Sequence, residues 1–330
     1  MSPTAERLPR VSVIVPVRDR RDLLRDLLDG LANQTMNDFE VVVVDDGSTD
    51  GSWDEAHNAA GRGLLVRVER TTGIGAVAAR SVGVASARSD LLAFTDSDCV
   101  PDPGWLAAGV AALESGADIV AGATTAARAP DVLERTVYEE VDDGLCATCN
   151  VFYRRTAFDA AGGFTEAGRL LGFRFNRRAK KLGFGEDTLL AWRVRRTGRF
   201  EFEPRALVRH GVLRPSVREI LWRTWVVGAF PTLVREVPEL RTLLLRGRMW
   251  LGPRRRLPVY ALIPAAALPW RIWLLPAVGV WWVAATTITM RRARGSRKRR
   301  LLAIPVEMAV DAITAVALVA GSIRARTLVL

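Results

Sequence analysis

Short, almost uniformly apolar segments alternate with segments of helical periodicity in the first third of the chain. Asp22–Leu31 repeats leucine at helical spacing, and Ile74–Ala87 is rich in small residues and also has a helical pattern. Strands without polar alternation are typical of a parallel sheet that helices cover on both faces. The strand-like segments are Val11–Val17, Phe39–Val44, Leu64–Val68 and Leu91–Thr95.

The pattern loosens after Asp118, where strand-like segments no longer alternate with helices in a regular way. Ile119–Ala123, Thr148–Tyr153 and Phe200–Val208 are expected to be strands, and Glu186–Thr197 is expected to be a helix. A chain of 330 residues is long enough for one large α/β domain and an appendage. We therefore predict an α/β domain over residues 1–234 and a C-terminal helical region over residues 235–330.

The C-terminal region is unusually apolar. Leu257–Met290 is apolar apart from Arg271, and Leu301–Ile323 is apolar apart from Glu307 and Asp311. A membrane-spanning helix needs about 20 apolar residues, so the first of these segments is long for one span and short for two. It also carries tryptophan and tyrosine side chains of the kind that gather at membrane interfaces: Tyr260, Trp270, Trp273, Trp281 and Trp282.

Basic clusters flank these apolar segments. Arg254–Arg256 precedes the first, and Arg291–Arg300 separates the two. Because basic loops tend to stay on the cytoplasmic side, we expect Leu257–Met290 to return, either as a hairpin around Pro269–Arg271 or as an interfacial segment. The alternative is that these helices form a buried core or a dimer interface, which leaves a homo-oligomer open.

The net charge of +11 is carried mostly by arginine, which supplies 44 of the 47 basic residues. Basic clusters beside apolar segments usually bind anionic lipid headgroups, at about 1 kcal/mol per residue near the surface. Nucleic acid is the rival partner. We do not expect it, because the basic segments lack interleaved aromatic residues and lie beside membrane-like sequence.

The cysteine count and the N-terminus both indicate a cytoplasmic location for the first domain. Three cysteines do not make a disulfide framework, and the single Cys146-x-x-Cys149 pair has no second pair to complete a structural zinc site. We expect both thiols to be half-buried. Met1–Arg10 is polar and leads directly into a strand, without the pattern of a signal peptide.

Acidic residues follow two of the predicted strands. Asp96-Ser97-Asp98 comes directly after the strand Leu91–Thr95, and the segment Asp45–Ser52 ends the second strand. Two carboxylates at positions i and i+2 can bind one Mg²⁺ or Mn²⁺ ion, which would also take diphosphate oxygens. Ligands bind beyond the carboxyl ends of parallel strands, and Arg18–Arg20 follows the first strand at the same edge.

With these strand ends in order, residues Val11 to Gly211 resemble the family 2 inverting glycosyltransferases, whose catalytic domain has the GT-A fold. The motifs that carry the resemblance are Val15-Pro16-Val17, Asp45-Asp46-Gly47-Ser48, Ala79-Arg80-Ser81-Val82-Gly83, Asp96-Ser97-Asp98, Gly162-Gly163-Phe164 and Gly185-Glu186-Asp187. Two positions depart from the family pattern. Ser81 stands where asparagine is frequent, and Arg18–Arg20 stands where asparagine or glutamate is frequent.

The resemblance implies a role for each matching residue. Asp187 would be the catalytic base, and Glu186 and Trp222 would lie at the acceptor. Asp98 would bind Mn²⁺ or Mg²⁺ together with Asp96 and His210. The nucleotide contacts would be Pro16, Arg18, Asp46, Ser48, Arg80 and Asp96.

These roles imply an inverting, metal-dependent transfer from a nucleotide-diphosphate sugar to an acceptor at the cytoplasmic membrane face. One carboxylate takes the proton of the acceptor hydroxyl, and the cation neutralises charge on the leaving diphosphate. The Gln-x-x-Arg-Trp signature of processive synthases is missing, with Leu221–Trp225 the nearest segment, so we expect transfer of one sugar. The acceptor would be a lipid-linked sugar or a polyprenyl phosphate.

Three alternatives compete with this hypothesis. Gly73–Ala78 matches the dinucleotide fingerprint G-x-G-x-x-A of dehydrogenases, but it follows the third strand, and the acid about 20 residues later belongs to the Asp96–Asp98 triplet. A sugar nucleotidyltransferase would need a triphosphate loop after the first strand and would leave Glu186 and Asp187 unused. A membrane-anchored, non-catalytic binder of nucleotide sugars is the third alternative.

Overall fold

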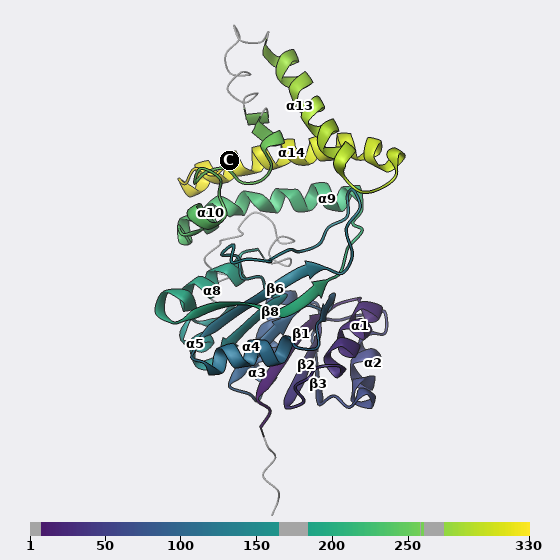
Figure 1. Cartoon of the computed structure of the whole chain (residues 1–330), viewed down its shortest axis with the longest axis vertical. Coiled ribbons are helices and arrows are strands. Elements are labelled where there is room, and N and C mark those ends of the chain that lie inside the picture. Colours follow the sequence, from purple (N-terminus) through teal and green to yellow (C-terminus); the bar gives the residue numbers. More distant parts are fainter. Residues whose placement is uncertain (1–7, 165–183, 258, 261–273) are drawn as a thin grey trace, which may run out of the picture. The chain divides into compact units, whose positions relative to one another are not determined.

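The computed structural model describes residues 8–164, 184–257, 259–260 and 274–330 of the chain, coloured along the sequence in Figure 1. The chain forms two compact units. The first comprises residues 1–127 and 137–211, and the second comprises residues 128–136 and 212–330. The units divide after Gly211, whereas the domain boundary predicted after residue 234 falls within helix α10; a division into functional domains stays a prediction.

An eight-stranded sheet forms the centre of the first unit, in the order β3-β2-β1-β4-β7-β6-β8-β5. The first four strands in this order are parallel to one another, as predicted. β7 and β5 run antiparallel to their neighbours, so the sheet as a whole is mixed. The strands are β1 (Val11–Val17), β2 (Phe39–Asp45), β3 (Val66–Arg70), β4 (Leu91–Thr95), β5 (Cys99–Pro101), β6 (Ile119–Ala126), β7 (Asn150–Arg154) and β8 (Phe200–His210).

Helices cover both faces of this sheet, which explains why its central strands β1, β2 and β4 are mostly apolar. Val13 and Val15 pack in one cluster with helices α1 and α4, whereas Val42 and Val44 pack on Ala79 of α3. All seven residues of β1 and of β2 are buried, and each large apolar side chain removed from water contributes about 1.5–3 kcal/mol. The helices of this unit are α1 (Arg21–Ala32), α2 (Ser52–His57), η1 (Asn58–Arg62), α3 (Ala76–Ser86), α4 (Trp105–Glu114), α5 (Arg155–Ala160) and α8 (Glu186–Thr197).

The second unit is helical. Among the described residues, α14 is long and apolar enough to cross a membrane, judged by length and composition. The turn predicted around Pro269–Arg271 lies outside the described residues. The helices are α9 (Val217–Thr224), η2 (Trp225–Ala229), α10 (Phe230–Glu236), α11 (Leu240–Leu243), η3 (Arg254–Arg256), α13 (Leu274–Arg292) and α14 (Arg297–Ala325).

A network of buried ion pairs holds α14 in the second unit. Arg255 lies 2.5 Å from a carboxylate oxygen of Glu307 and 3.1 Å from one of Asp311. Arg256 lies 3.3 Å from the other oxygen of Asp311, and Arg135 lies 3.3 Å from Glu307. Asp311 is fully buried and Glu307 nearly so, and the arginines supply the partners that such buried acidic side chains need.

Removing Asp311 should therefore cost far more than removing an exposed acid. We expect Asp311→Ala to lower the free energy of unfolding by about 3–5 kcal/mol, because it leaves Arg255 and Arg256 buried without that partner. Asp22→Ala, which removes an exposed partner of Arg25, should change the same quantity by less than about 1 kcal/mol. Urea unfolding of both variants measures the difference, and equal effects would contradict the importance of the network.

Candidate functional site

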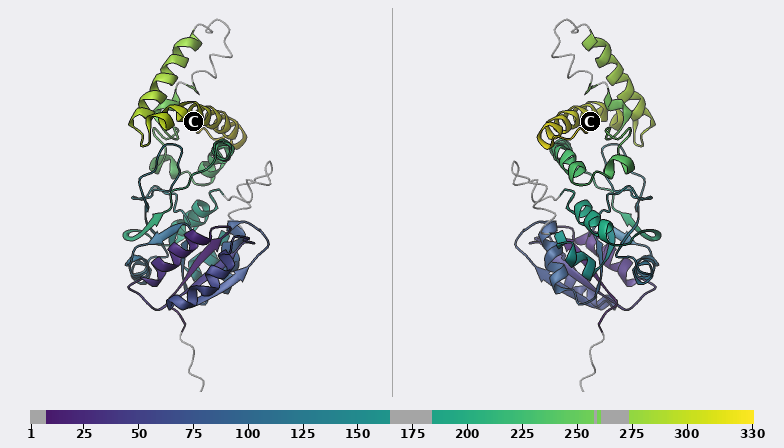
Figure 2. Two further views of the ribbon diagram at one scale, coloured as in Figure 1. Left: turned by 90° about the vertical axis from the view of Figure 1, so that its right-hand side faces the viewer. Right: turned by 90° about the vertical axis from the view of Figure 1, so that its left-hand side faces the viewer.

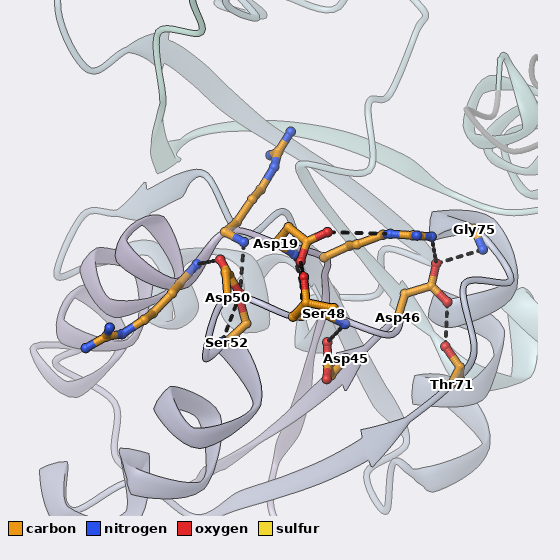
Figure 3. A network of polar contacts seen from close by, with 12 residues as sticks. Asp19, Asp45, Asp46, Ser48, Asp50, Ser52, Thr71 and Gly75 are labelled. Carbon is orange, nitrogen blue, oxygen red and sulfur yellow. Dashed lines mark hydrogen bonds and ion pairs between the residues drawn. The ribbon is translucent and has the colours of Figure 1, made fainter.

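The loops that follow β1 and β2 are hydrogen-bonded to each other at the carboxyl edge of the sheet (Figure 3). The backbone N–H of Asp19 donates to Oγ of Ser48 at 3.0 Å, and that of Arg20 donates to Oγ of Ser52 at 3.1 Å. Ser48 in turn donates its own N–H to Asp45 at 2.9 Å. The predicted convergence of these two strand ends is therefore present, and short polar side chains fix it.

Asp46 is buried and fastens the loop after β3 to this edge, as Figure 3 shows. One carboxylate oxygen accepts from Oγ1 of Thr71 at 2.5 Å and from the N–H of Ile74 at 2.7 Å, and the other accepts from the N–H of Gly75 at 2.8 Å. Arg18 lies 3.9 Å from the second oxygen. Both oxygens of Asp46 therefore have partners within the protein, and its predicted contact with the nucleotide stays a prediction.

The glycines of the apparent dinucleotide fingerprint serve this loop. Gly73 and Gly75 both have a positive φ, at 82° and 95°, which most other residues adopt only with strain. A Cβ atom on Gly73 would lie 2.8 Å from the guanidinium of Arg18. Gly73 thus lets the loop approach Arg18 closely, and Gly75 lets the chain turn directly before α3 begins.

Arginines neutralise the two carboxylates of the Asp96-Ser97-Asp98 triplet. Arg80, a buried residue of α3, forms a short ion pair with Asp96. Arg20 lies 2.5 Å from Oδ2 of Asp98, a buried residue with an exposed fraction of 5%. From the sequence, Arg80 is expected at the nucleotide. The ion pair between Arg20 and Asp98 is not predicted there.

The other oxygen of Asp98, Oδ1, has no hydrogen-bond partner among the described residues and lies 3.7 Å from Nε2 of His210. Nδ1 of His210 is 2.8 Å from the carbonyl oxygen of Gly211, which can only accept, so Nδ1 carries a proton and a neutral ring would have its lone pair on Nε2. Two electron-pair donors that face each other in a buried site fit a divalent cation. Asp98, Cys99 and His210 each offer a ligand atom within 4.8 Å of the others.

Glu186 and Asp187 begin helix α8, directly after Gly185 in a left-handed conformation. The N–H of Phe184 donates to Glu186 at 2.5 Å, and the N–H of Thr188 donates to Asp187 at 2.8 Å. Burial and the neighbouring Asp187 carboxylate raise the pKa of Glu186 to about 7, and burial also raises the pKa of Asp187. A carboxylate with a raised pKa is a better base near neutral pH.

One face of α8 binds the loop of residues 142–148. Thr188 donates to the carbonyl of Leu145 at 2.8 Å, and Trp192 donates to that of Gly144 at 2.8 Å. One helical turn later, Arg195 forms a bidentate pair with Asp142 at 2.7 and 2.9 Å and approaches Sγ of Cys146. Cys146 and Cys149 are free and fully buried rather than half-buried as we expected.

Glu139 is a buried carboxylate near Asp187, the predicted base. No feature of the sequence predicts a role for Glu139. Its exposed fraction is 4%, Oε2 accepts from the N–H of Ala147 at 3.2 Å, and Oε1 has no hydrogen-bond partner in the part of the chain that the structure describes. Burial, followed by the charges of Asp143 and Asp187, raises the pKa of Glu139 to about 8. A lone glutamate in a loop has no sequence pattern, so its burial could be found only from the structure.

The contacts of two predicted site residues do not test the roles expected of them. Pro16 is buried within β1, opposite Val44. Trp222 is half-buried on α9 of the second unit. The structure therefore assembles the acids and arginines of the first unit, and the roles of Pro16 and Trp222 stay predictions.

Residues 12–180, just over half of the chain, match the family model described as glycosyl transferase family 2. The chain belongs to this family. It is 31% identical over 172 residues to the glycosyltransferase AglE of Haloferax volcanii, a match that covers 48% of this chain and 56% of AglE. It is 28% identical over 258 residues to the pre-mycofactocin glycosyltransferase of Mycobacterium tuberculosis, covering 72% of this chain and 50% of the relative. The chain thus spans about half the length of these curated relatives.

Solved structures support the same fold. The mannosyltransferase PcManGT of Pyrobaculum calidifontis, in complex with GDP-Man and Mn²⁺, is 18% identical with a TM-score of 0.54, covering 97% of this chain and 88% of its own. Residues 1–349 of TarS from S. aureus, in complex with UDP-GlcNAc, are 16% identical with a TM-score of 0.50, covering 96% and 92%. These likenesses confirm the predicted α/β fold of GT-A type.

The raised pKa of Glu139 predicts a pH dependence of stability. The folded chain keeps a proton that the unfolded chain releases near the ordinary value of 4.5. Stability from this group is fully present below about pH 4.5 and is lost as the pH rises through about 8. Glu139→Gln cannot lose this proton, so its Tm should rise relative to the wild type between about pH 5 and about pH 8.5.

Thermal unfolding by circular dichroism at the two pH values measures this change. Glu219→Gln, which alters an exposed glutamate, is the control and should show the same pH trend as the wild type. A constant Tm difference between Glu139→Gln and the wild type would contradict the raised pKa.

Proposed function

We propose that this chain transfers a single sugar, with inversion, from a nucleotide-diphosphate sugar to an acceptor hydroxyl, with the help of Mn²⁺ or Mg²⁺. The observation that carries the proposal is the position of Arg80. It pairs with Asp96 of the triplet and also lies within electrostatic reach of Asp187 and Glu186. Asp96, expected at the sugar donor, and Asp187, the expected base, thus both interact with the buried guanidinium of Arg80.

The residues of the chain divide the chemistry between them. Asp187 takes the proton of the attacking hydroxyl, and its raised pKa suits it to hold that proton. Arg18 and Arg20, at the loop after β1, add positive charge where the diphosphate would lie. Oδ1 of Asp98 and Nε2 of His210 would hold the cation, which would neutralise charge on the leaving nucleoside diphosphate.

The nature of the donor is supported by family membership and by the ligands of the structural neighbours. PcManGT was solved with GDP-Man and TarS with UDP-GlcNAc, so both neighbours bind nucleotide-diphosphate sugars. Asp46 and the loop that it fastens would form the wall against the nucleotide, together with Ser48. The missing Gln-x-x-Arg-Trp signature supports transfer of one sugar rather than polymerisation.

For the acceptor, we propose a lipid-linked sugar, which would attack through a hydroxyl, or a polyprenyl phosphate, which would attack through a phosphate oxygen, at the cytoplasmic face of the cell membrane. The apolar helix α14 and the basic segment before it support a location beside lipid. The acceptor class is tested by comparing transfer to a polyprenyl-linked acceptor with transfer to the same headgroup without its lipid. Equal rates would contradict it.

The experiment that tests the transfer is a panel of nucleotide sugars, with and without Mn²⁺ or Mg²⁺, scored for release of nucleoside diphosphate. We expect release with one donor class, and only with the cation. Asp187→Asn should reduce turnover by about 10²–10⁴-fold, because it removes the base, while donor binding measured by calorimetry stays within about twofold.

The matched control is Asp159→Asn, which changes an exposed acid of α5 in the same unit and should leave turnover unchanged. Unchanged turnover in Asp187→Asn would refute the assignment of the base. Donor binding without release by any donor of the panel would instead favour a non-catalytic binding protein.

A further inference from the structure

Helix α14 buries several polar side chains on its inner face and exposes large apolar side chains on its outer face. Glu307, Asp311, Thr314 and Ser322 are all buried against the rest of the second unit. The outward residues are Leu301, Leu302, Val316 and Ile323, with exposed fractions of 56%, 61%, 51% and 75%. At 3.6 residues per turn these four positions fall within an arc of roughly 100°, so they form one stripe along the helix, here named the outer stripe.

Charged and irregular chain covers the inner face of the N-terminal half of α14. At its start the exposed Arg299 pairs with Asp131 at 3.3 Å, and just before α14 the N–H of Val132 donates to the carbonyl of Arg294 at 3.2 Å. The residues that pair with Glu307 and Asp311 are likewise charged and come from segments outside α14. Such chain does not occur next to lipid within the hydrocarbon layer, because its polar backbone would have no partners there.

The inner face of the C-terminal half is covered as closely. A Cβ atom on Gly321 would lie 2.2 Å from the carbonyl oxygen of Gly228, so α14 and η2 are in backbone contact. Oγ of Ser322 donates to the carbonyl of Val329 and accepts from its N–H, at 2.8 and 3.0 Å. Protein therefore covers one side of α14 over its whole length, and a helix in that position cannot be surrounded by lipid.

Exposed apolar side chains also occur on α13, and a strongly basic turn joins α13 to α14. Figures 1 and 2 show α13 and α14 joined by this turn. Val280, Trp281, Val283 and Ile288 of α13 are also exposed, and tryptophan is frequent at membrane interfaces. Seven arginines and lysines occur in Arg291–Arg300, and no acidic residue occurs between Met290 and Val306. Exposed apolar side chains beside a cationic segment match an anionic lipid surface in both polarity and charge.

We propose that α14 lies flat on an anionic membrane, with the outer stripe at the boundary between headgroups and acyl chains, and does not cross the bilayer. The basic turn Arg291–Arg300 binds the headgroups. This arrangement places both ends of α14 on the same side of the membrane. It does not depend on the proposed sugar transfer, because it rests on residues of the second unit alone.

Flotation of the full chain with vesicles tests the membrane contact. Vesicles of phosphatidylcholine with phosphatidylglycerol should bind the chain at least tenfold more tightly than vesicles of phosphatidylcholine alone. The double substitution Leu302→Glu and Ile323→Glu should weaken binding to the anionic vesicles by at least tenfold. Leu65→Glu, which changes an exposed leucine of the first unit, should not weaken it.

Circular dichroism and donor hydrolysis of the same variants should match the wild type, which separates loss of membrane contact from loss of folding or activity. Equal binding by all variants would overturn the proposal. So would a dimer that the double substitution converts to a monomer without vesicles, because a second copy would then cover the outer stripe.

Labelling of single added cysteines tests the orientation. Lys298→Cys and Leu328→Cys stand near opposite ends of α14, and Cys99, Cys146 and Cys149 are buried. Both added thiols should react with an impermeant maleimide in inverted membrane vesicles from expressing cells, and neither should react in intact spheroplasts. Reaction of one in the vesicles and of the other in the spheroplasts would show a spanning helix and overturn the proposal.

Discussion

The gathering of carboxylates at one edge of the sheet is the constraint on which the site depends. Parallel strands bring Asp46, Asp96 and Asp98 to this edge, and Asp46 and Asp98 are buried there. Like charges that are buried close together repel one another, and each needs an oppositely charged or hydrogen-bonding partner to offset this cost. The fold meets this requirement with Arg80 at Asp96, Arg20 at Asp98 and loop N–H groups at Asp46. The loops after β1, β2 and β3 therefore take their positions from the acids that they neutralise.

This constraint divides the acids into two groups with different chemistry. Asp96 and Asp98 each form an ion pair with an arginine, at the edge where a cation or a diphosphate would lie. Glu186 and Asp187 accept backbone N–H groups, and burial raises the pKa of both. Neighbouring carboxylates in such different environments are typical of an active site that separates charge stabilisation from proton transfer.

The sequence predicted the parts that local pattern determines. The strands β1, β2 and β4 are mostly apolar because helices cover both faces of the sheet, and acids follow β2 and β4 in a recognisable order. The antiparallel direction of β5 and β7 was missed, because a short apolar segment has no pattern that gives its direction. The pair of Arg20 with Asp98 joins distant positions in the sequence, and Glu139 is a single acid in a loop. In α14 the apolar composition was visible, but not that Glu307 and Asp311 face inward.

Binding of Mn²⁺ to the full chain with a nucleoside diphosphate, measured by electron paramagnetic resonance, tests the central claim most directly. The cation should bind through Oδ1 of Asp98 and Nε2 of His210, which face each other at 3.7 Å. His210→Ala and Asp98→Asn should each weaken Mn²⁺ binding by about tenfold or more. Asp19→Asn, which alters an exposed acid at the same edge, should leave it unchanged. Unaltered affinity in both His210→Ala and Asp98→Asn would contradict the assignment of the site.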